Sequence, residues 1–293
     1  PASFQSKDST LAGFNIDKDF GVPYMQDIAF VGKQYEFRRE MPWMANDCSG
    51  FGSCYSNYAD YTIAGNTFDY PYVHGKAMLK AGYAFYSCSN EAFCSDTTFR
   101  SSAWAVDMVC GKQVTTVVGS GLQKKYEVFP EEMQDALTAF TTDGGHVLVS
   151  GAYIGTDIWD QIYPFEKDKE GTATAKKFAQ NVLGFKWAAN SASRKGSVRF
   201  ISNTAISELP SATMQICNEI NPEQYSVESP DGLTPSGKGA VSFMRYTDSG
   251  ITAGICKDGS GYRTVCLGFP VEALESEDSI NKIINLTLEF FSR

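Results

Sequence analysis

Apolar and polar residues follow helix-like and strand-like periods from residue 71 onward, whereas residues 1–70 show no clear period. The stretch Tyr72–Ala81 is compatible with a helix, and the short apolar run Tyr83–Ser87 after it predicts a buried strand. A second run of this kind, Ala105–Cys110, predicts another strand. Residues 1–70 are rich in Asp, Gly, Ser, Asn and aromatic residues, so we expect long ordered loops there.

The clearest helix–strand unit comes next in the chain. Pro130, Glu131 and Glu132 suit the first turn of a helix, and the apolar residues that follow recur on one helical face. A buried strand is predicted over His146–Ser150, and a second amphipathic helix over Thr172–Leu183. Short apolar strands that alternate with helices predict a mostly parallel, flavodoxin-like sheet with helices on both faces.

After Gly196 the pattern changes to closely spaced strands separated by glycine-containing turns, which predicts an antiparallel C-terminal extension. A closing helix is predicted from about Glu277. The predicted strands of this part are Val198–Ser202, Val241–Tyr246, Ile251–Cys256 and Tyr262–Leu267. No low-complexity linker divides the chain, so we predict one composite α/β domain over 1–293, made of a loop-rich part (1–70), a parallel core (71–195) and an antiparallel part with the closing helix (196–293).

Charge and hydropathy exclude some partners. The chain has 25 Lys and Arg against 34 Asp and Glu, a net charge of −9, and such a field repels the phosphate backbone of nucleic acids. No apolar run approaches the roughly 18 residues that a membrane-spanning helix needs. The first residues, Pro1–Phe4, do not form a basic and apolar leader, so we expect any targeting signal to have been removed. We therefore predict no nucleic-acid partner and no membrane span.

Four of the eight cysteines form two copies of one spacing, Cys48-x5-Cys54 and Cys88-x5-Cys94. Local disulfides fit this spacing and would imply an oxidising compartment, and free thiols are the alternative. Neither spacing matches the zinc-site templates, and no cofactor motif is complete, so we predict no metal and no cofactor. Three cysteines lie in apolar strand-like runs and are expected to be buried: Cys110, Cys256 and Cys266.

Ligands of open α/β sheets bind beyond the carboxyl ends of the parallel strands. The polar segments Ser87–Glu91, Gly111–Gln113 and Ser150–Asp157 follow predicted strands and are expected to converge. Within the last segment, Gly-Ala-Tyr-Ile-Gly has the form of a nucleophile elbow with Tyr153 in the nucleophile position. A tyrosine hydroxyl is a poor nucleophile without a strong base, so a conventional triad is not expected. A nearby ammonium lowers the pKa of a phenol, and Tyr153 with Lys112 is therefore predicted as an acid/base pair.

A second group of polar residues suits ligand binding rather than catalysis. The stretch Asn66–Gly75 mixes amide, carboxylate, aromatic and imidazole groups, a composition that suits sugars. Asp47 opens a glycine-containing loop that lacks the Gly-Lys-Ser/Thr ending of a phosphate-binding loop. For Asn66–Gly75, a capped, aromatic-packed loop is at least as good an interpretation. The candidate ligand contacts are Asp47, Asn66, Asp69, His74, Glu91, Ser150 and Asp157.

The helix Glu131–Thr142, the strand and elbow His146–Gly155, and the late segment Val265–Glu272 together resemble the class I glutamine amidotransferase-like superfamily. That resemblance implies a flavodoxin-like α/β fold. In active members a cysteine occupies the elbow and a late strand ends in His-Pro-Glu, whereas here Tyr153 replaces the cysteine and the histidine is missing. The carboxylate is kept, which makes Glu272 a third catalytic candidate, and glutamine hydrolysis is not expected.

Nearly the whole chain is similar to a group of bacterial exported proteins called xanthan lyase-like. The matching stretches are Phe30–Tyr35, Ile63–Pro71, His74–Lys76 and Ser150–Gly155. The resemblance implies a periplasmic or secreted protein associated with a carbohydrate or cell-envelope polymer, with a first sheet strand before Pro1. Whether the protein is an enzyme stays open. If it is one, a polysaccharide lyase or hydrolase is expected, and the alternative is a catalytically inactive scaffold or interaction protein.

Overall fold

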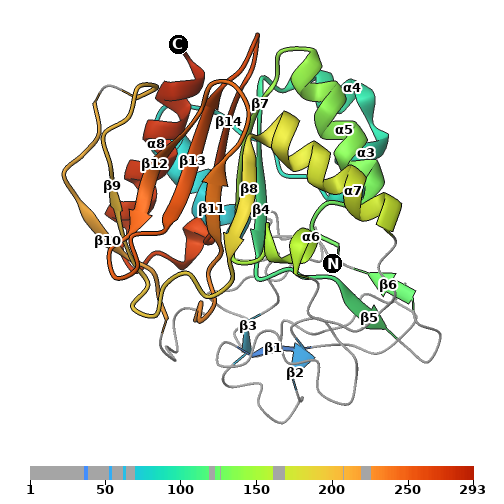
Figure 1. The fold of residues 1–293 in the computed structure, drawn as a ribbon. Helices are drawn as coiled ribbons and strands as arrows, with labels where there is room; N and C mark the ends of the chain where they lie inside the picture. Colours follow the sequence, from blue (N-terminus) through green and yellow to red (C-terminus); the bar gives the residue numbers. More distant parts are fainter. Residues whose placement is uncertain are drawn as a thin grey trace, which may run out of the picture.

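The computed structural model describes residues 70–118, 123–125, 127–160, 169–206, 208–218 and 226–293, together with three short strands within 36–63. These strands, β1 (Glu36–Arg38), β2 (Ser53–Cys54) and β3 (Thr62–Ile63), form one small antiparallel sheet. A two-stranded sheet of β5 (Thr116–Val118) and β6 (Gln123–Lys125) lies apart from the main sheet (Figure 1). The long loops expected within residues 1–70 and the candidates Asp47, Cys48, Asn66 and Asp69 lie outside the described residues.

A mixed nine-stranded sheet is the centre of the described structure (Figure 1). Its strands, in order across the sheet, are β10 (Thr213–Gln215), β9 (Ser197–Phe200), β12 (Ala240–Tyr246), β13 (Thr252–Asp258), β14 (Arg263–Leu267), β7 (His146–Gly151) and β4 (Ala105–Gly111), while β11 (Gly232–Pro235) pairs with both β13 and β8 (Phe185–Ala189). Strand β7 runs parallel to its two neighbours, β14 and β4. Every other pair in this sheet is antiparallel.

Helices cover both faces of this sheet. One face holds α2 (Tyr70–Lys80), η3 (Val271–Ala273) and α8 (Glu277–Phe291). The other face holds α3 (Asn90–Ser95), α4 (Thr97–Ser102), α5 (Glu131–Thr142), α7 (Lys169–Phe178) and the π-helix η2 (Ala179–Leu183), with the short helix α6 (Thr156–Trp159) following β7 (Figure 1). None of the described helices is both long and apolar enough to cross a membrane.

The prediction of a flavodoxin-like, mostly parallel sheet is wrong, because antiparallel strand pairs outnumber parallel ones among the described strands. Strands β12, β13 and β14 follow one another through short turns, and a short turn reverses the chain, so these neighbours run antiparallel. They continue the same sheet as β7, because Leu267 of β14 pairs directly with Ser150. The prediction that strands alternate with helices is correct for β4 and β7, which are parallel neighbours with α5 between them in the chain. The rest of the sheet does not follow this alternation.

The predicted strand over Tyr83–Ser87 is also wrong, because this run pairs with no described strand and Tyr86 is 80% exposed. An apolar run becomes a strand only where a neighbour completes its backbone hydrogen bonds, and sequence does not show whether that neighbour exists. The helix predicted over Thr172–Leu183 does form, but it begins earlier, at Lys169, and its last turn is η2.

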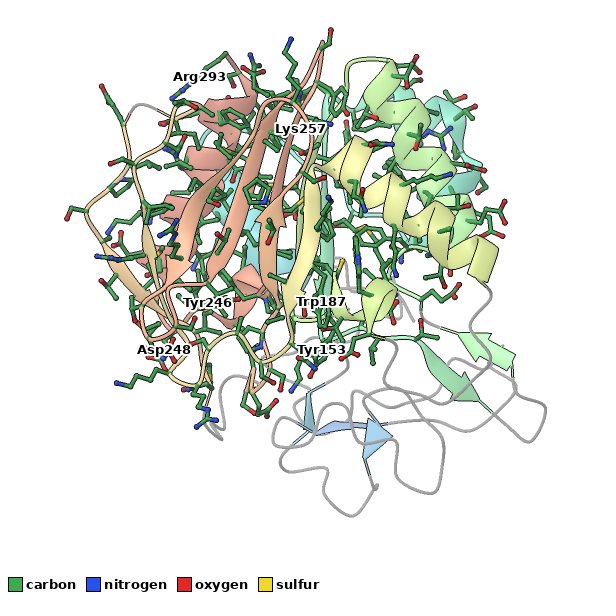
Figure 2. The ribbon with its side chains drawn as sticks, in the orientation of Figure 1. Tyr153, Trp187, Tyr246, Asp248, Lys257 and Arg293 are labelled. Carbon is green, nitrogen blue, oxygen red and sulfur yellow. The ribbon has the colours of Figure 1, made fainter. Side chains whose placement is uncertain are left out.

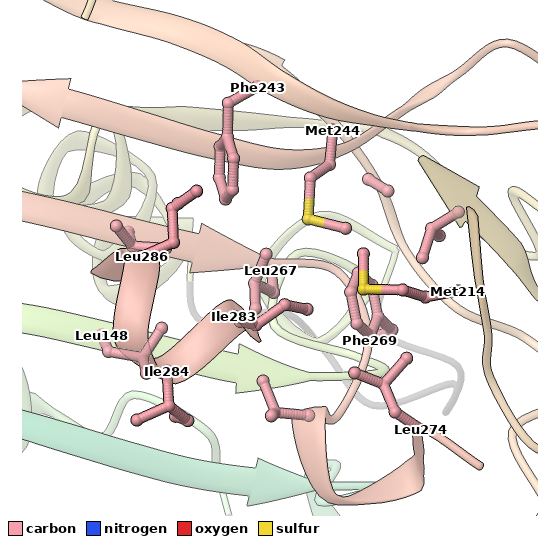
Figure 3. Close-up of a cluster of buried hydrophobic side chains, with 14 of the residues drawn as sticks. Leu148, Met214, Phe243, Met244, Leu267, Phe269, Leu274, Ile283, Ile284 and Leu286 are labelled. Atoms are coloured by element: carbon pink, nitrogen blue, oxygen red, sulfur yellow. The ribbon is translucent and has the colours of Figure 1, made fainter. Parts of the chain in front are cut away.

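The core divides into two clusters because successive side chains of a strand point to opposite faces of the sheet. In β7, Leu148 packs on the side of α8, whereas Val147 and Val149 pack on the side of α5. Figure 3 shows the first cluster, in which Leu267 and Ile283 lie within a group of buried side chains from strands and helix. Complete burial of one such side chain contributes about 1.5–3 kcal/mol, so this cluster fixes α8 on the sheet.

Candidate functional site

Three polar residues that are far apart in the sequence contact one another where α2 packs on the sheet. His74 of α2 lies between two carboxylates: its Nδ1 is 2.6 Å from Oδ2 of Asp107, and its Nε2 is 3.1 Å from Oε2 of Glu272. Asp107 belongs to β4, and Glu272 to η3, which follows β14. The side chains of His74 and Glu272 are 2% and 0% exposed, and that of Asp107 is 9% exposed. We call these three residues the His74 cluster.

The charges of the His74 cluster hold the imidazole in its protonated form. Burial by itself lowers the pKa of His74, but the charge and hydrogen bond of Asp107, assisted by Glu272, raise it to about 10. At neutral pH an imidazolium therefore lies between the side chains of Asp107 and Glu272. A histidine in this state donates from both nitrogens, so His74 has no lone pair with which to act as a general base.

Two buried oxygen atoms on the same face of the sheet make no hydrogen bond within the described residues: Oδ1 of Asp107 and Oγ of Ser150. Residue Val109 of β4 pairs with Ser150, and Asp107 lies two positions earlier, so the alternation of the strand places both side chains on the face of the His74 cluster. Among the described residues no group of three or more His, Cys, Asp or Glu is arranged to hold a metal ion. This face therefore offers oxygen acceptors but no metal cage.

The predicted acid/base residues Lys112 and Tyr153 follow the carboxyl ends of β4 and β7, respectively. Figure 2 shows Tyr153 at this end of the sheet. The Nζ of Lys112 donates to the carbonyl oxygen of Ser226 at 2.8 Å and to Glu228 at 2.5 Å. Burial lowers the pKa of Lys112 to about 8, although Glu228 acts in the opposite direction. Tyr153 is 9% exposed and packs in the same apolar cluster as Leu148. The acid/base partnership of the two side chains stays a prediction.

The carboxylate of Asp157 accepts hydrogen bonds from backbone N–H groups of two neighbouring segments. Its two carboxylate oxygens accept the N–H groups of Thr115 at 2.7 Å and of Val128 at 2.9 Å. These contacts connect the turn after β7 to the chain after β4 and to the approach to α5. The carboxylate is therefore occupied by structural hydrogen bonds.

Sequence reasoning missed Asp231, which caps α6 from another part of the chain. Its carboxylate accepts the N–H groups of Gly155 at 2.6 Å and Thr156 at 2.8 Å, the hydroxyl of Thr156, and the indole N–H of Trp187 at 3.2 Å. Burial raises the pKa of Asp231 to about 7, while these hydrogen bonds oppose that shift. Figure 2 shows Trp187 and Tyr153 at the same end of the sheet, where α6 begins. Asp107 was missed as well, although an acidic residue inside an apolar strand was its signal.

Glu91, a further predicted ligand contact, is exposed in the first turn of α3. Close to it in sequence are two exposed rings, Tyr86 and Trp104, and two half-buried rings, Tyr83 and Phe99. We call Tyr83, Tyr86, Phe99 and Trp104 the aromatic surface. The rings of Tyr83 and Trp104 have centroids 5.5 Å apart, and those of Tyr86 and Phe99 are 6.2 Å apart. Tyr86 is 80% exposed and Trp104 is 43% exposed. The aromatic surface thus presents Tyr86 and Trp104 to solvent, and each of them contacts a half-buried ring.

The cysteines separate into buried and accessible groups. Cys110, Cys256 and Cys266 are buried, as predicted, and burial raises the pKa of each thiol. Cys88 and Cys94 are free thiols; Cys88 precedes α3 and Cys94 lies within it.

No protein-family model matches the chain, and no curated protein matches it significantly. Among solved structures, the chain is similar to a β-galactosidase of the Antarctic haloarchaeon Halorubrum lacusprofundi, with 13% identity and a TM-score of 0.35 over 56% of this chain and 20% of that one. It is also similar to a β-galactosidase of Bacillus circulans sp. alkalophilus, with 10% identity and a TM-score of 0.33 over 64% of this chain and 21% of that one. The chain spans about a fifth of the length of each enzyme. At these TM-scores the likeness assigns neither a fold family nor an activity.

Proposed function

We propose that the chain binds a carbohydrate or cell-envelope polymer outside the cytoplasm, that the aromatic surface is its contact region, and that the His74 cluster performs no turnover. The exposure of Tyr86 and Trp104 is the observation that carries this proposal. Large rings are usually buried, and exposed apolar patches often mark contact surfaces. The resemblance of the sequence to an exported, polymer-associated group supports the same class of ligand.

The chemistry of a sugar ring fits the aromatic surface. A pyranose presents an apolar face of C–H groups that stacks on an aromatic ring, while its hydroxyls require polar partners at the edge. The chain that leads from Tyr86 into α3 supplies such partners, because Ser87, Asn90 and Glu91 are all exposed. A hydroxyl-rich polymer therefore meets both kinds of contact within a few residues.

The charge of the chain favours an uncharged polymer over an acidic one. A net charge of −9 repels a polyanion at low salt, and added salt screens this repulsion. We therefore expect affinity for a neutral glycan to change little with ionic strength, and affinity for an acidic glycan to rise as salt is added.

Binding without turnover follows from the state of the predicted catalytic groups. His74 is held as an imidazolium by Asp107 and Glu272, so it does not accept a proton at neutral pH. Lys112 is engaged by Glu228 and the Ser226 carbonyl oxygen. These groups stabilise the fold in the proposal, and the exposed rings carry the affinity.

The proposal is tested by affinity electrophoresis and calorimetry with neutral and acidic polysaccharides and peptidoglycan fragments. Replacing Trp104 or Tyr86 with Ala is expected to weaken binding by about tenfold or more, as for a central aromatic contact. Leu79→Ala is the matched control, because Leu79 is 59% exposed and contributes no ring. Product analysis of the same mixtures is expected to show intact polymer.

Three outcomes contradict the proposal or a part of it. If the unchanged protein binds none of these polymers, the aromatic surface serves another partner. If the Tyr86 and Trp104 variants bind as well as Leu79→Ala, the contact lies elsewhere. Released sugar in excess of the protein contradicts the part of the proposal that excludes turnover.

A further inference from the structure

Two arginines lie directly opposite each other on neighbouring strands of the main sheet. Arg199 belongs to β9 and Arg245 to β12, and the antiparallel pairing of these strands sets the two residues side by side. Directly opposite residues of an antiparallel pair have their Cβ atoms about 4.5–5.5 Å apart on one face of the sheet. Both side chains are exposed. We call these two residues the arginine pair.

The arginine pair lies on a part of the sheet that no described helix covers. Val198 and Phe200, the neighbours of Arg199 in β9, are buried in the same cluster as Ile283 of α8, so the alternation of the strand points Arg199 to the opposite face. On that opposite face, α5 and η2 lie over β7, β8 and β14. In Figure 1, β9 and β12 lie at the left of the sheet, whereas α5 and α7 lie at its right. The two guanidinium groups therefore face solvent.

No acid neutralises the arginine pair within the described residues, where every ion pair involves a different cation. The acid nearest to Arg245 in the sequence is Asp248. Its carboxylate accepts the hydroxyl of Ser193 and the N–H groups of Arg194 and Lys195. Like charges directly opposite each other destabilise a sheet. A negatively charged ligand would remove this repulsion, since the described chain supplies no counter-charge.

Hydroxyl groups continue the row on either side of the arginine pair. Thr213 of β10 lies opposite Arg199, and Thr252 of β13 lies opposite Arg245. Thr213 is exposed, and the Oγ1 of Thr252 lies 2.9 Å from the Oγ of Ser242. Hydroxyl and guanidinium groups both donate hydrogen bonds to oxyanions. The open face therefore presents a row of donors that is centred on two positive charges.

We infer that the arginine pair binds a phosphate group, either free phosphate or a small phosphomonoester. A guanidinium donates two parallel N–H groups to such an oxyanion, and a phosphate near its dianionic form balances both positive charges. The net charge of −9 opposes a long polyanion, whereas a small dianion interacts mainly with charges within about 8–10 Å. The ligand is therefore a small phosphate compound and not a polyphosphate chain.

This site is separate from the proposed polymer contact. Trp104 of the aromatic surface directly precedes β4, which forms one edge of the sheet, whereas β9 lies next to the opposite edge. The inference therefore goes beyond the proposed function and does not depend on it.

NMR titration of the full chain with inorganic phosphate at pH 8 tests the inference. The backbone amides of β9 and β12 and the Nε–H signals of the arginine pair are expected to shift along a saturating curve. Sodium nitrate at equal ionic strength is expected to give no saturating shift, because nitrate carries a single charge. Phosphate shifts that do not differ from those with nitrate overturn the inference.

Single substitutions locate the phosphate on the arginine pair. Arg199→Gln and Arg245→Gln are each expected to weaken phosphate binding about three- to tenfold, and the double variant is expected to show no saturation. Lys238→Gln is the matched control, because Lys238 is exposed on the turn before β12 and its loss changes the net charge by the same amount. Equal phosphate affinity in the wild type and the double variant, or an equal loss in Lys238→Gln, overturns the inference.

Glycerol 3-phosphate distinguishes the two forms of the ligand. Dissociation constants similar to that of inorganic phosphate indicate that the phosphate group alone is recognised. Binding more than about tenfold tighter assigns the site to phosphomonoesters, because the additional affinity then comes from the rest of the molecule.

Thermal unfolding checks the repulsion within the arginine pair. Without phosphate, Arg199→Gln is expected to melt at the wild-type temperature or slightly above it, because one of two like charges is removed. Phosphate is expected to raise the melting temperature of the wild type more than that of the variant. A variant that melts well below the wild type without phosphate overturns the argument from repulsion. None of these measurements uses a polymer, so failure of the proposed function is recognised separately.

Discussion

Replacing His74 with Gln tests the electrostatic interpretation of the His74 cluster most directly. The substitution removes the imidazolium that lies between Asp107 and Glu272 while keeping a polar side chain of similar reach. Two buried carboxyl groups then lose the cation that both of them contact. Removing one partner of a buried ion pair typically costs about 3–5 kcal/mol, so the free energy of unfolding at neutral pH is expected to fall by that amount.

The pH dependence has a definite sign. The pKa of His74 is raised from 6.5 to about 10 in the folded protein, so the folded state binds its proton more tightly than the unfolded state. The resulting stabilisation is complete below pH 6.5 and is lost as the pH rises toward 10, with a span of at most about 5 kcal/mol. Lys112, whose pKa is lowered to about 8, acts in the opposite direction above pH 8. Because both proteins contain Lys112, the difference between wild type and His74→Gln isolates the histidine.

Urea unfolding of both proteins at pH 6, 8 and 10 measures this difference, and histidine NMR reports the titration itself. The chain has two histidines. His146 is the natural control, because burial and the charge of Arg263 lower its pKa. We expect the His74 signal to keep its protonated shift to about pH 10 and the His146 signal to titrate below its ordinary value. A His74 signal that titrates near 6.5, or a stability difference that does not change with pH, refutes the reasoning.

Three further substitutions test the packing around the site, each by the free energy of unfolding in urea. Asp231→Ala leaves the N–H groups of Gly155 and Thr156 without their acceptor, and a loss of about 3 kcal/mol is expected; a change below about 1 kcal/mol contradicts the capping role. Gly268→Ala places a Cβ 2.1 Å from the backbone oxygen of Asp231, so about 2–3 kcal/mol is expected, and wild-type stability would show that the strands separate easily. Leu267→Ala empties a fully buried position and is expected to cost about 2–5 kcal/mol, whereas exposed Leu79→Ala is expected to cost little.

The elements that could be read from the sequence are those whose signal is local. Helices α5 and α8 form where the apolar residues recur on one face, and α8 begins at the capping residue Ser276, whose Oγ accepts the N–H of Ser279 at 3.1 Å. Strands β4 and β7 were predicted from apolar runs nearly to the residue. In each case the periodic apolar residues lie within a window of about fifteen residues. The pattern requires only that one face of the helix or strand packs against an apolar surface.

Two of the three residues of the His74 cluster were predicted as candidates, but from separate observations that did not place them next to each other. His74 was proposed from a polar loop composition and Glu272 from a family resemblance, while Asp107 was read only as part of a strand. The structure brings His74 to Asp107 across 33 residues and to Glu272 across 198 residues. Ser150 and Lys112, by contrast, were placed correctly beyond or at the ends of their strands, because a strand end is a local feature.

The sequence by itself determined the helices α5 and α8, the strands β4 and β7, the burial of Cys110, Cys256 and Cys266, and the acidic character of the chain. Only the tertiary structure decided how the strands pair, that Tyr83–Ser87 is not a strand, and that His74 is a cation held by two acids. The physical reason is the range of the interactions. Apolar periodicity and capping act between residues a few positions apart, whereas strand direction, burial and the pKa of a buried group depend on neighbours that the fold brings from distant parts of the chain.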